Sequence, residues 1–515
     1  MFMSRGGFRL SGPASISGPR RTLLSLDHDF TSTPQRYHSA TSQTPTTLKT
    51  LDDLPGNWRN NWVSAYNFWR NKGNRNLHNI MLDNFNKFGS IYRERIGNYD
   101  SVFVLNLNDI DTLFRAEDIF PERLSLKPWL AYKDYRNEKY GILLKSGDDW
   151  RKNRLILNKA MFTPQAIQKF VPAINEVSLD FMSMVYRHTG KTRNGEWSVD
   201  LRNYLFKFTL QTICQLLYGQ RLSFLTNINK ESQQYINSII KLFKTTVPML
   251  YISPKLLKSI NSKIWQEHVE SWDVIHAHAN SFILKIYKEF QQGKINDKKN
   301  VGILQDILQQ DVLPIEDIRA NIIDIMTGAI DTTSTVLSWI TYELAKRPEF
   351  QENLRCEIME TSKKEGGDLV QMLKSVPLLR ATLKETLRIH PVGITLQRYL
   401  KKDLVLQNYL LPVGTLVHLG LYAMGRNSDI FSNPEKFRPE RWLEKERTNF
   451  TNLAFGFGPR QCIGRRIAET KVFIFLIHML QNFKIEYHHM TDVEDIFDFI
   501  LIPNKPIILT LKPIK

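Results

Sequence analysis

The longest helical pattern in the chain runs from Pro314 to Arg347 and reads PIEDIRANIIDIMTGAIDTTSTVLSWITYELAKR. Apolar residues recur along it at helical spacing, Pro314 suits a first helical turn, and Pro348 closes the segment. A helix of this length measures roughly 50 Å and crosses a whole domain. We therefore predict one large domain with a long central helix.

The middle of this segment, GAIDTTST, gathers residues that form helices weakly. Their hydroxyls can bond to backbone carbonyls one turn back and loosen the helix. Weak helix formers in the middle of a long helix contradict local helix propensity, and such contradictions are expected at functional sites. A buried polar kink without chemistry is the alternative.

The remaining chain after Trp58 also shows mostly helical spacing, with a few short strand patterns. Helices are predicted over 60–90, 147–160, 164–188, 198–218, 229–245 and 262–291. The segments 90–97 and 101–107 predict an antiparallel pair, and further short strands are expected near 394–406, 410–418, 484–489 and 499–513. The expected fold is mainly α with a small β region, and no linker divides it after residue 50.

The N-terminus differs from the rest of the chain. Its first 26 residues carry Arg5, Arg9, Arg20 and Arg21 with several serines, and no acidic residue precedes Asp27. This composition is typical of a mitochondrial transit peptide, which we expect over residues 1–39, although an ordinary tail is the alternative. The main domain would then span residues 40–515.

The chain carries 69 Lys and Arg against 52 Asp and Glu, a net charge of +17. No basic run is interleaved with aromatic residues, so we do not expect nucleic-acid binding. An acidic protein partner or an anionic membrane surface would explain the charge equally well. No run of about 18 apolar residues occurs, so we expect no membrane span.

The loop FGFGPRQCIG, Phe455 to Gly464, holds one of only three cysteines. Cys462 lies just before a predicted helix, whose N-terminal dipole favours a thiolate, and Arg460 adds a nearby cation. The glycines allow the backbone to turn tightly and to approach a planar ligand closely. Neither a disulfide framework nor a zinc site fits the scattered Cys214, Cys356 and Cys462, whereas a single thiolate suits a haem iron.

This loop resembles the haem-binding signature FxxGxRxCxG of the cytochrome P-450 superfamily at every fixed position, including Phe455 and Gly464. The resemblance covers everything after about residue 58. It implies a haem-thiolate monooxygenase fold in which Cys462 ligates the iron of haem b and favours O–O cleavage.

Two further motifs match the family's ExxR and PxxFxPxRW patterns. Glu385 and Arg388 are three residues apart on a predicted helix, where an exposed pair would contribute only a few tenths of a kcal/mol. The resemblance implies instead a buried network of Glu385, Arg388 and Arg441 that fixes the haem loop.

The motif WRKNR matches the family's WxxxR. The resemblance implies that Trp150 and Arg154 bind a haem propionate together with Arg460 and Arg398. It also implies that Asp331 and Thr332, in the long helix, deliver protons and bond the distal oxygen. Ala329 departs from the family's glycine, and its methyl group could narrow the space over the iron.

Several local stretches resemble the mitochondrial branch of the family, and most of all the enzymes that cleave the cholesterol side chain. This implies two successive hydroxylations and scission of a carbon–carbon bond to give pregnenolone. A sterol needs a long apolar slot with a polar anchor. Trp129, Ile394, Thr395 and Gln397 are our candidates for its lining, with Gln397 at the hydroxyl end; ordinary core packing is the alternative for each.

Electrons must come from a partner, since no flavin- or nicotinamide-binding glycine motif is present. By resemblance, a cationic surface would dock an adrenodoxin-like 2Fe–2S ferredoxin, which an NADPH-dependent reductase reduces. Its expected residues are Arg380, Lys384, Arg465 and Arg466. The alternative is a merely solvated basic face.

The segment VPMLYISPKLLKSI, residues 247–260, is apolar, with Lys255 and Lys258 placed to reach outward. We expect a loop that dips into the matrix face of the mitochondrial inner membrane as a peripheral contact.

Three other functions remain open. They are a sister mitochondrial hydroxylase of steroids, sterols or vitamin D, a haem-thiolate isomerase that needs no redox partner, and a haem-binding sensor without turnover.

Overall fold

A computed structural model describes residues 48–96, 99–225, 230–293, 302–444 and 452–514 of the 515-residue chain. The expected transit peptide, residues 1–39, lies outside these residues. The described part is mainly helical with a small β region, as predicted.

The helices of the first half are α1 (Asn61–Arg70), α2 (Gly73–Phe88), α3 (Leu107–Arg115), α4 (Lys127–Arg136), α5 (Gly147–Met161), α6 (Pro164–Thr189), α7 (Arg202–Tyr218), α8 (Lys230–Tyr251), α9 (Pro254–Ser259) and α10 (Lys263–Gln291). Most of these helices lie in the predicted segments, whereas α3, α4 and α9 were not predicted. The helix expected over 198–218 begins late, because Trp197–Asp200 forms strand β4 instead.

The second half contains the long helix and the elements that surround the cysteine loop. They are α11 (Ile303–Leu308), α12 (Ile315–Ala345), α13 (Pro348–Lys364), α14 (Leu369–Ser375), α15 (Pro377–Ile389), α16 (Leu421–Gly425) and α17 (Arg465–Asn482). Short 3-10 turns lie at Leu51–Asp53, Pro439–Trp442 and Gly458–Arg460.

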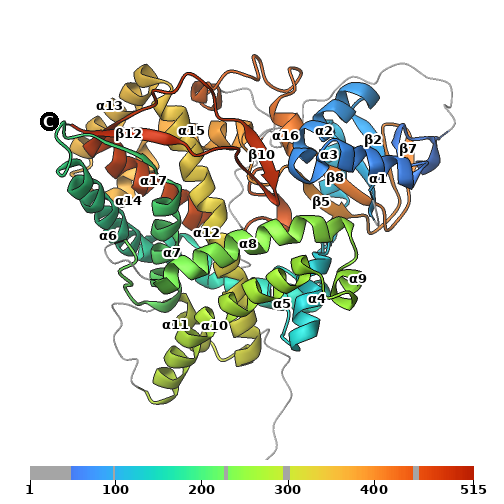
Figure 1. The fold of residues 1–515 in the computed structure, drawn as a ribbon, viewed down its shortest axis with the longest axis horizontal. Coiled ribbons are helices and arrows are strands. Elements are labelled where there is room, and N and C mark those ends of the chain that lie inside the picture. Colours follow the sequence, from blue (N-terminus) through green and yellow to red (C-terminus); the bar gives the residue numbers. More distant parts are fainter. Residues whose placement is uncertain (1–47, 97–98, 226–229, 294–301, 445–451, 515) are drawn as a thin grey trace, which may run out of the picture. The chain divides into compact units, whose positions relative to one another are not determined.

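Helix α12 passes through the middle of the described body and packs against α7, α10 and α15 (Figure 1). Most of its side chains are buried, since it has neighbours on several sides. The expected loosening at GAIDTTST does not interrupt it. Thr332 does donate a hydrogen bond to the Gly328 carbonyl, at 2.7 Å, but the helix is continuous from Ile315 to Ala345.

The main sheet has five strands in the order β1-β2-β3-β8-β5 and lies to one side of the helices, beside α1, α2 and α3 (Figure 1). Its strands are β1 (Gly56–Asn57), β2 (Ile91–Ile96), β3 (Tyr99–Val104), β8 (Leu416–Leu419) and β5 (Leu396–Tyr399). The predicted pairing of β2 with β3 is confirmed as antiparallel.

Register places four side chains in one row across this sheet. Tyr92 pairs with Phe103, Phe103 with His418, and His418 with Gln397. In the next row on β2 and β3, Glu94 pairs with Ser101. Side chains at alternate positions share a face, so both rows face the same side of the sheet.

Three smaller sheets complete the β region. They are β6 (Leu404–Leu406) with β7 (Tyr409–Leu411), β10 (Asp495–Asp498) with β11 (Ile500–Pro503), and β4 with β12 (Ile508–Pro513) and β9 (Phe483–Glu486). In the tight hairpin of β10 and β11, Phe499 takes a left-handed backbone conformation, with φ of 69°. A phenylalanine adopts this conformation only under local strain.

Candidate active site

The cysteine loop is held in a fixed turn directly before α17. The Cys462 N–H donates to the Phe455 carbonyl at 2.7 Å, and α17 begins three residues later, at Arg465. Gly456 and Gly458 have φ of +78° and +67°, which explains why glycine occupies both positions. Gly464 has no such requirement, but its N–H donates to the Cys462 sulfur.

The thiol of Cys462 is solvent-accessible and at the same time closely surrounded by protein. The surrounding protein desolvates it, and this burial raises the pKa of the thiol. The Gly464 N–H, Arg154 and Arg465 act against the rise by favouring the thiolate. Arg123, which lines the main cavity, interacts electrostatically with Cys462, so the thiol lies in the neighbourhood of this cavity.

Four arginines converge near this thiol: Arg123, Arg154, Arg398 and Arg460. Burial, followed by mutual repulsion, lowers the pKa of Arg460 to about 9, and burial lowers that of Arg154 to about 10. The Nε of Arg154 is buried and has no partner among the described residues. This surplus of buried positive charge fits the two propionates and the thiolate ligand of a haem.

Each arginine that is predicted to bind a haem propionate also donates hydrogen bonds to the protein's own backbone. Arg154 donates to the Gln461 carbonyl at 2.7 Å, which joins α5 to the cysteine loop. Arg460 donates to two backbone carbonyls and lies 3.8 Å from the ring of Trp150. Arg398 donates to Phe457 and is paired with Glu117, a contact that the sequence did not suggest.

Arg123 was missed by the sequence analysis. It donates to the Leu143 carbonyl at 2.6 Å and lines the main cavity, and its pKa is lowered by burial and by Arg398. It belongs to none of the recognised motifs, so only the fold brings it to the site.

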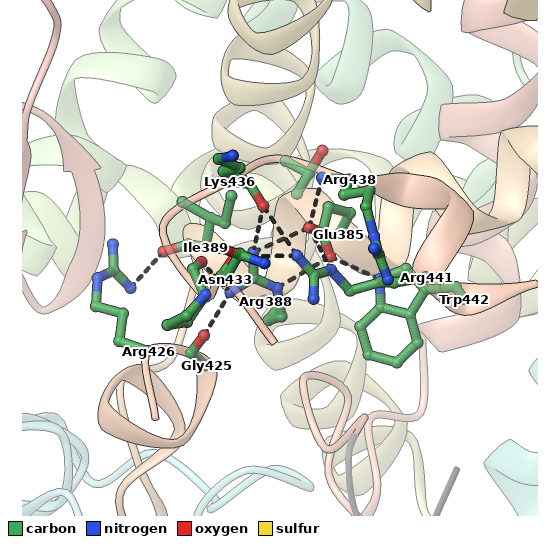
Figure 2. Close-up of polar contacts among 12 residues, drawn as sticks. Glu385, Arg388, Ile389, Gly425, Arg426, Asn433, Lys436, Arg438, Arg441 and Trp442 are labelled. Atoms are coloured by element: carbon green, nitrogen blue, oxygen red, sulfur yellow. Dashed lines mark hydrogen bonds and ion pairs between the residues drawn. The ribbon is translucent and has the colours of Figure 1, made fainter. Parts of the chain in front are cut away.

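The predicted charged network is present and fully buried (Figure 2). Arg388 binds both oxygens of Glu385 at 2.9 Å, and Arg441 Nε lies 3.0 Å from Oε1. Figure 2 shows both guanidinium groups turned toward the carboxylate. The Arg438 backbone N–H and the Trp442 indole N–H also donate to it, both at 2.8 Å.

The same two arginines bind the segment that leads to the cysteine loop. Their remaining N–H groups donate to backbone carbonyls of Gly425, Ser432, Asn433, Pro434 and Lys436. One buried carboxylate therefore fixes α15, the end of α16 and the segment 432–442 together.

A cavity of about 360 Å³ lies between α12 and the main sheet. Its volume is in the range of small-molecule sites. Gly328 and Thr332 of α12 line it, together with apolar side chains of other elements, which are Leu77, Met81, Ile96, Phe103, Leu124, Leu126, Trp129, Leu143, Phe243, Leu250, Phe497, Phe499 and Ile500.

One region of the cavity wall is polar and has unused hydrogen-bonding groups. The strand residues Glu94, Tyr99 and His418 line it. Glu94 Oε2, the Tyr99 hydroxyl and His418 Nε2 are buried without a hydrogen-bond partner in the described part of the chain. Burial raises the pKa of Glu94 to about 7 and lowers that of His418 to about 3. Buried polar groups need partners, so this region suits a ligand that carries a hydroxyl.

The four predicted lining residues all border this cavity. The Trp129 indole already donates to Thr246, at 2.9 Å, and therefore offers its ring rather than its N–H. Ile394 and Thr395 lie before β5. Gln397 donates to the Thr395 hydroxyl at 2.6 Å and pairs in register with His418, beside the unpartnered groups.

Asp331 and Thr332 differ in their surroundings. Thr332 lines the cavity, whereas Asp331 is buried beside Thr335, whose hydroxyl bonds its carboxylate at 3.4 Å. Burial raises the pKa of Asp331 to about 6, so that it exchanges a proton near neutral pH.

Ala329, which replaces the family's glycine, lies beside a residue of the cavity wall. Gly328 lines the cavity, and a methyl group added there would meet open space. Ala329 is not among the lining residues and packs against the apolar core.

The four residues of the expected ferredoxin surface all have contacts within the chain. Arg380 is exposed and donates to the Leu373 carbonyl at 2.6 Å, and Lys384 lies over the Trp442 ring. In the first turn of α17, Arg465 pairs with Glu469 at 3.0 Å, and Arg466 lies over Phe162.

The segment 247–260 is helical, so the expected loop is wrong. It comprises the end of α8, which continues through Pro248 to Tyr251, and the short helix α9. Leu256 and Ile260 are exposed beside Lys255 and Lys258, and the other face is packed against the protein. Across the described ranges, no helix is long and apolar enough to cross a membrane.

Most of the chain is similar in sequence to known proteins of one family. The family model Cytochrome P450 matches residues 55–511. The chain is 55% identical, over 99% of its length and all of the relative's, to the protein named cholesterol side-chain cleavage enzyme, mitochondrial, of Hypanus americanus. It is 46% identical to the protein of that name from Oncorhynchus mykiss, over 98% of both chains, and 41% identical to the one from Bos taurus, over 91% of this chain and 90% of the relative.

Proposed function

Because this chain belongs to the cytochrome P450 family, we propose that it is the mitochondrial haem-thiolate monooxygenase that converts cholesterol to pregnenolone. The observation that carries this proposal is the joint position of a desolvated cysteine, a cationic cluster and an apolar cavity with one polar region. Relatives that are named for this reaction match over nearly the whole chain.

The chain's own residues account for haem binding. Cys462 would ligate the iron, and Arg154, Arg460, Arg398, Arg123 and Trp150 would bind the propionates. Haem supplies the centre at which dioxygen is activated. The Glu385 network would keep the cysteine loop in place, since loss of one member leaves a buried uncompensated charge.

The cavity would orient the sterol. Its apolar wall excludes water and binds the ring system, while the unpartnered groups at Glu94, Tyr99 and His418 would accept or donate hydrogen bonds to the ring hydroxyl. A ligand anchored in this way presents the same part of its side chain at each turnover, as two hydroxylations and a bond cleavage require.

Proton delivery would come from α12. Thr332 lines the cavity, and the carboxyl group of Asp331 next to it holds a proton at neutral pH more readily than an exposed aspartate does. Thr332 donates to the Gly328 carbonyl in this structure, so its hydroxyl would have to rotate to donate a hydrogen bond into the cavity.

The electron donor we propose is an acidic 2Fe–2S ferredoxin of the adrenodoxin type, reduced by an NADPH-dependent reductase. Its dock would include Arg380, Lys384, Arg465 and Arg466. The net charge of +17 supports this proposal, because it favours encounter with an acidic partner.

The protein would act on the matrix side of the mitochondrial inner membrane, after removal of residues 1–39. Exposed apolar and cationic residues of α9 support a peripheral contact there.

Reconstitution tests the function. Haem-loaded protein without residues 1–39 would be incubated with ferredoxin, its reductase, NADPH and cholesterol in vesicles. Pregnenolone is the expected product. A protein that leaves cholesterol intact but hydroxylates another steroid would instead be a sister mitochondrial hydroxylase.

A further inference from the structure

His390, which directly follows α15, lies between two buried carboxylates. Its Nδ1 is 2.7 Å from Asp495 Oδ1, and its Nε2 is 3.0 Å from Glu343 Oε1. The imidazole also stacks on the indole of Trp339, with ring centres 3.8 Å apart. Ionised carboxylates only accept hydrogen bonds, so both ring nitrogens must donate, and the geometry fits an imidazolium.

Asp495 is the first residue of β10 and anchors the hairpin of β10 and β11. Its second oxygen, Oδ2, lies 3.2 Å from Arg426 Nη2. From this anchored base the hairpin carries three side chains to the cavity wall, those of Phe497, Phe499 and Ile500.

The tip of the hairpin reaches across to the aromatic residues of the opposite wall. The ring of Phe499 lies 5.0 Å from that of Phe243 and 5.8 Å from that of Trp129. A shift of the hairpin base would therefore change the shape of the ligand-binding space. The strained backbone of Phe499 needs such support to keep its conformation.

We propose that protonated His390 is a positioning residue that holds the hairpin of β10 and β11 against the cavity, so that substrate binding weakens when the imidazole loses its proton. This inference rests on the proposed function only in taking the cavity as the substrate site. The effect follows from the geometry, since a neutral imidazole can donate through one nitrogen only. The other nitrogen would then face a carboxylate oxygen as a second acceptor.

The charges around His390 determine the direction of the effect. Burial alone would lower its pKa, but Asp495 and Glu343 together raise the pKa above the ordinary value of 6.5. We call His390, Asp495 and Glu343 together the clamp. Its contribution to stability is therefore complete below about pH 6.5 and is lost as the pH rises through the raised pKa of His390. Other titratable or charged groups that face these three residues come from α2, α12, α16 and the residues that follow α12 and α16, and are His78, Tyr342, Lys346, Arg347, Tyr422 and Arg426.

Those neighbours do not replace the imidazolium. Arg426 binds the other oxygen of Asp495, and Arg347 pairs with the other oxygen of Glu343. Burial lowers the pKa of His78 to about 4, so His78 is neutral wherever His390 titrates. Among the described residues, His390 is the side chain that hydrogen-bonds both carboxylates, and in this way it adds a polar link between α12 and the base of the hairpin.

Hydrogen–deuterium exchange of the haem-loaded protein tests the clamp. The expected result is that backbone amides of residues 495–503 exchange several-fold faster at about pH 9 than at about pH 6, after correction for the intrinsic pH dependence. His390→Gln should show the fast exchange at both pH values. Glu343→Gln, which removes one charged acceptor, should show the transition at a lower pH than the wild type.

The control is His478→Gln. His478 is a histidine in α17 that contacts the Asn175 amide, at 2.6 Å, and no carboxylate. It should leave exchange in the hairpin and its pH dependence unchanged. Equal corrected exchange at both pH values in the wild type would overturn the proposal, as would wild-type exchange in His390→Gln or an unshifted transition in Glu343→Gln.

Cholesterol binding, followed through the haem absorbance band, gives the second readout. Wild-type affinity should fall over the pH range in which the hairpin loosens, and His390→Gln should bind weakly throughout. An affinity that does not follow the exchange would overturn the positioning role. Absence of cholesterol binding at every pH would count against the proposed substrate. The exchange data would still show whether protonated His390 holds the hairpin.

Discussion

Arg441 Nε lies 3.0 Å from Glu385 Oε1, although the two residues are 56 positions apart in the chain. The carboxylate has no exposed surface, and Arg388 binds it from the same helix. This contact joins α15 to the segment before the cysteine loop, so the position of the haem ligand depends on a residue that does not touch the cavity.

Glu385→Gln should lower the free energy of unfolding by about 3–5 kcal/mol, because it leaves two buried guanidinium groups without a counter-charge. Urea denaturation of the purified protein would measure the loss. The matched control is Arg438→Ala, since only the backbone N–H of Arg438 bonds Glu385 and its side chain pairs with Glu444 at the surface. Arg438→Ala should lower the free energy of unfolding by less than about 1 kcal/mol. Equal losses in the two variants would contradict the network.

Arg154→Leu should reduce haem retention several-fold, since it removes a buried guanidinium with an unpartnered Nε. The haem-free variant should be no less stable than the haem-free wild type, because the change also relieves repulsion with Arg123. The haem-to-protein ratio after gel filtration and thermal unfolding would measure both effects. Lys152→Leu, an exposed change in the same helix, serves as the control. Full haem occupancy in Arg154→Leu would exclude the propionate role.

Asp331→Asn should stabilise the protein above pH 6 and slow turnover. The folded state holds the pKa of Asp331 at about 6, above the ordinary 3.8, so wild-type stability falls as the pH rises through this range. Asparagine does not ionise, and its advantage at higher pH should be on the order of 3 kcal/mol. Urea denaturation near pH 4 and pH 8 would measure it. An equal difference between variant and wild type at both pH values would contradict this assignment.

Gly328→Ala should weaken substrate binding, whereas Ala329→Gly should not. The first change places a methyl group in the cavity, and the second only removes a good helix former, at a cost of about 1 kcal/mol. Cholesterol titrations and thermal unfolding of both variants would separate the two effects. Tighter binding in Ala329→Gly, with unchanged binding in Gly328→Ala, would place the crowding where the sequence first suggested it.

Glu94→Gln should weaken cholesterol binding about tenfold, by roughly 1.4 kcal/mol, if its free oxygen accepts the ring hydroxyl. A sterol that lacks this hydroxyl should bind the variant and the wild type alike. Absorbance titrations with both sterols provide the comparison. An equal loss for the two ligands would mean that Glu94 only shapes the cavity.

The parts of the fold with strong local signals could be predicted from the sequence. Helix α12 was correctly placed because Pro314 and Pro348 bound a long apolar pattern, although Pro348 also opens α13. Strand β4 was missed, since its four residues depend on pairing with β12, some 300 positions away, as Ser198 and Thr510 show. Local periodicity contains no information about such a partner.

The site residues also fall into those that sequence motifs reveal and those that only the fold brings together. Cys462 and Glu385 lie in motifs whose spacing is visible along the chain, and the structure places Cys462 directly before α17 and Glu385 between two arginines, as predicted. Glu94 and His418 come from two different strands and look like ordinary alternating positions, so their shared face emerges only from register. Arg123 likewise reaches the arginine cluster through the fold alone.

The most direct test of the central claim is the mass of the product formed from cholesterol labelled in both its rings and its side chain. Reconstituted protein should release pregnenolone that keeps the ring label, together with a separate fragment that carries the side-chain label. Cys462→Ser should give neither. Hydroxylated cholesterol that accumulates with both labels intact would contradict side-chain cleavage and identify a hydroxylase of the same family.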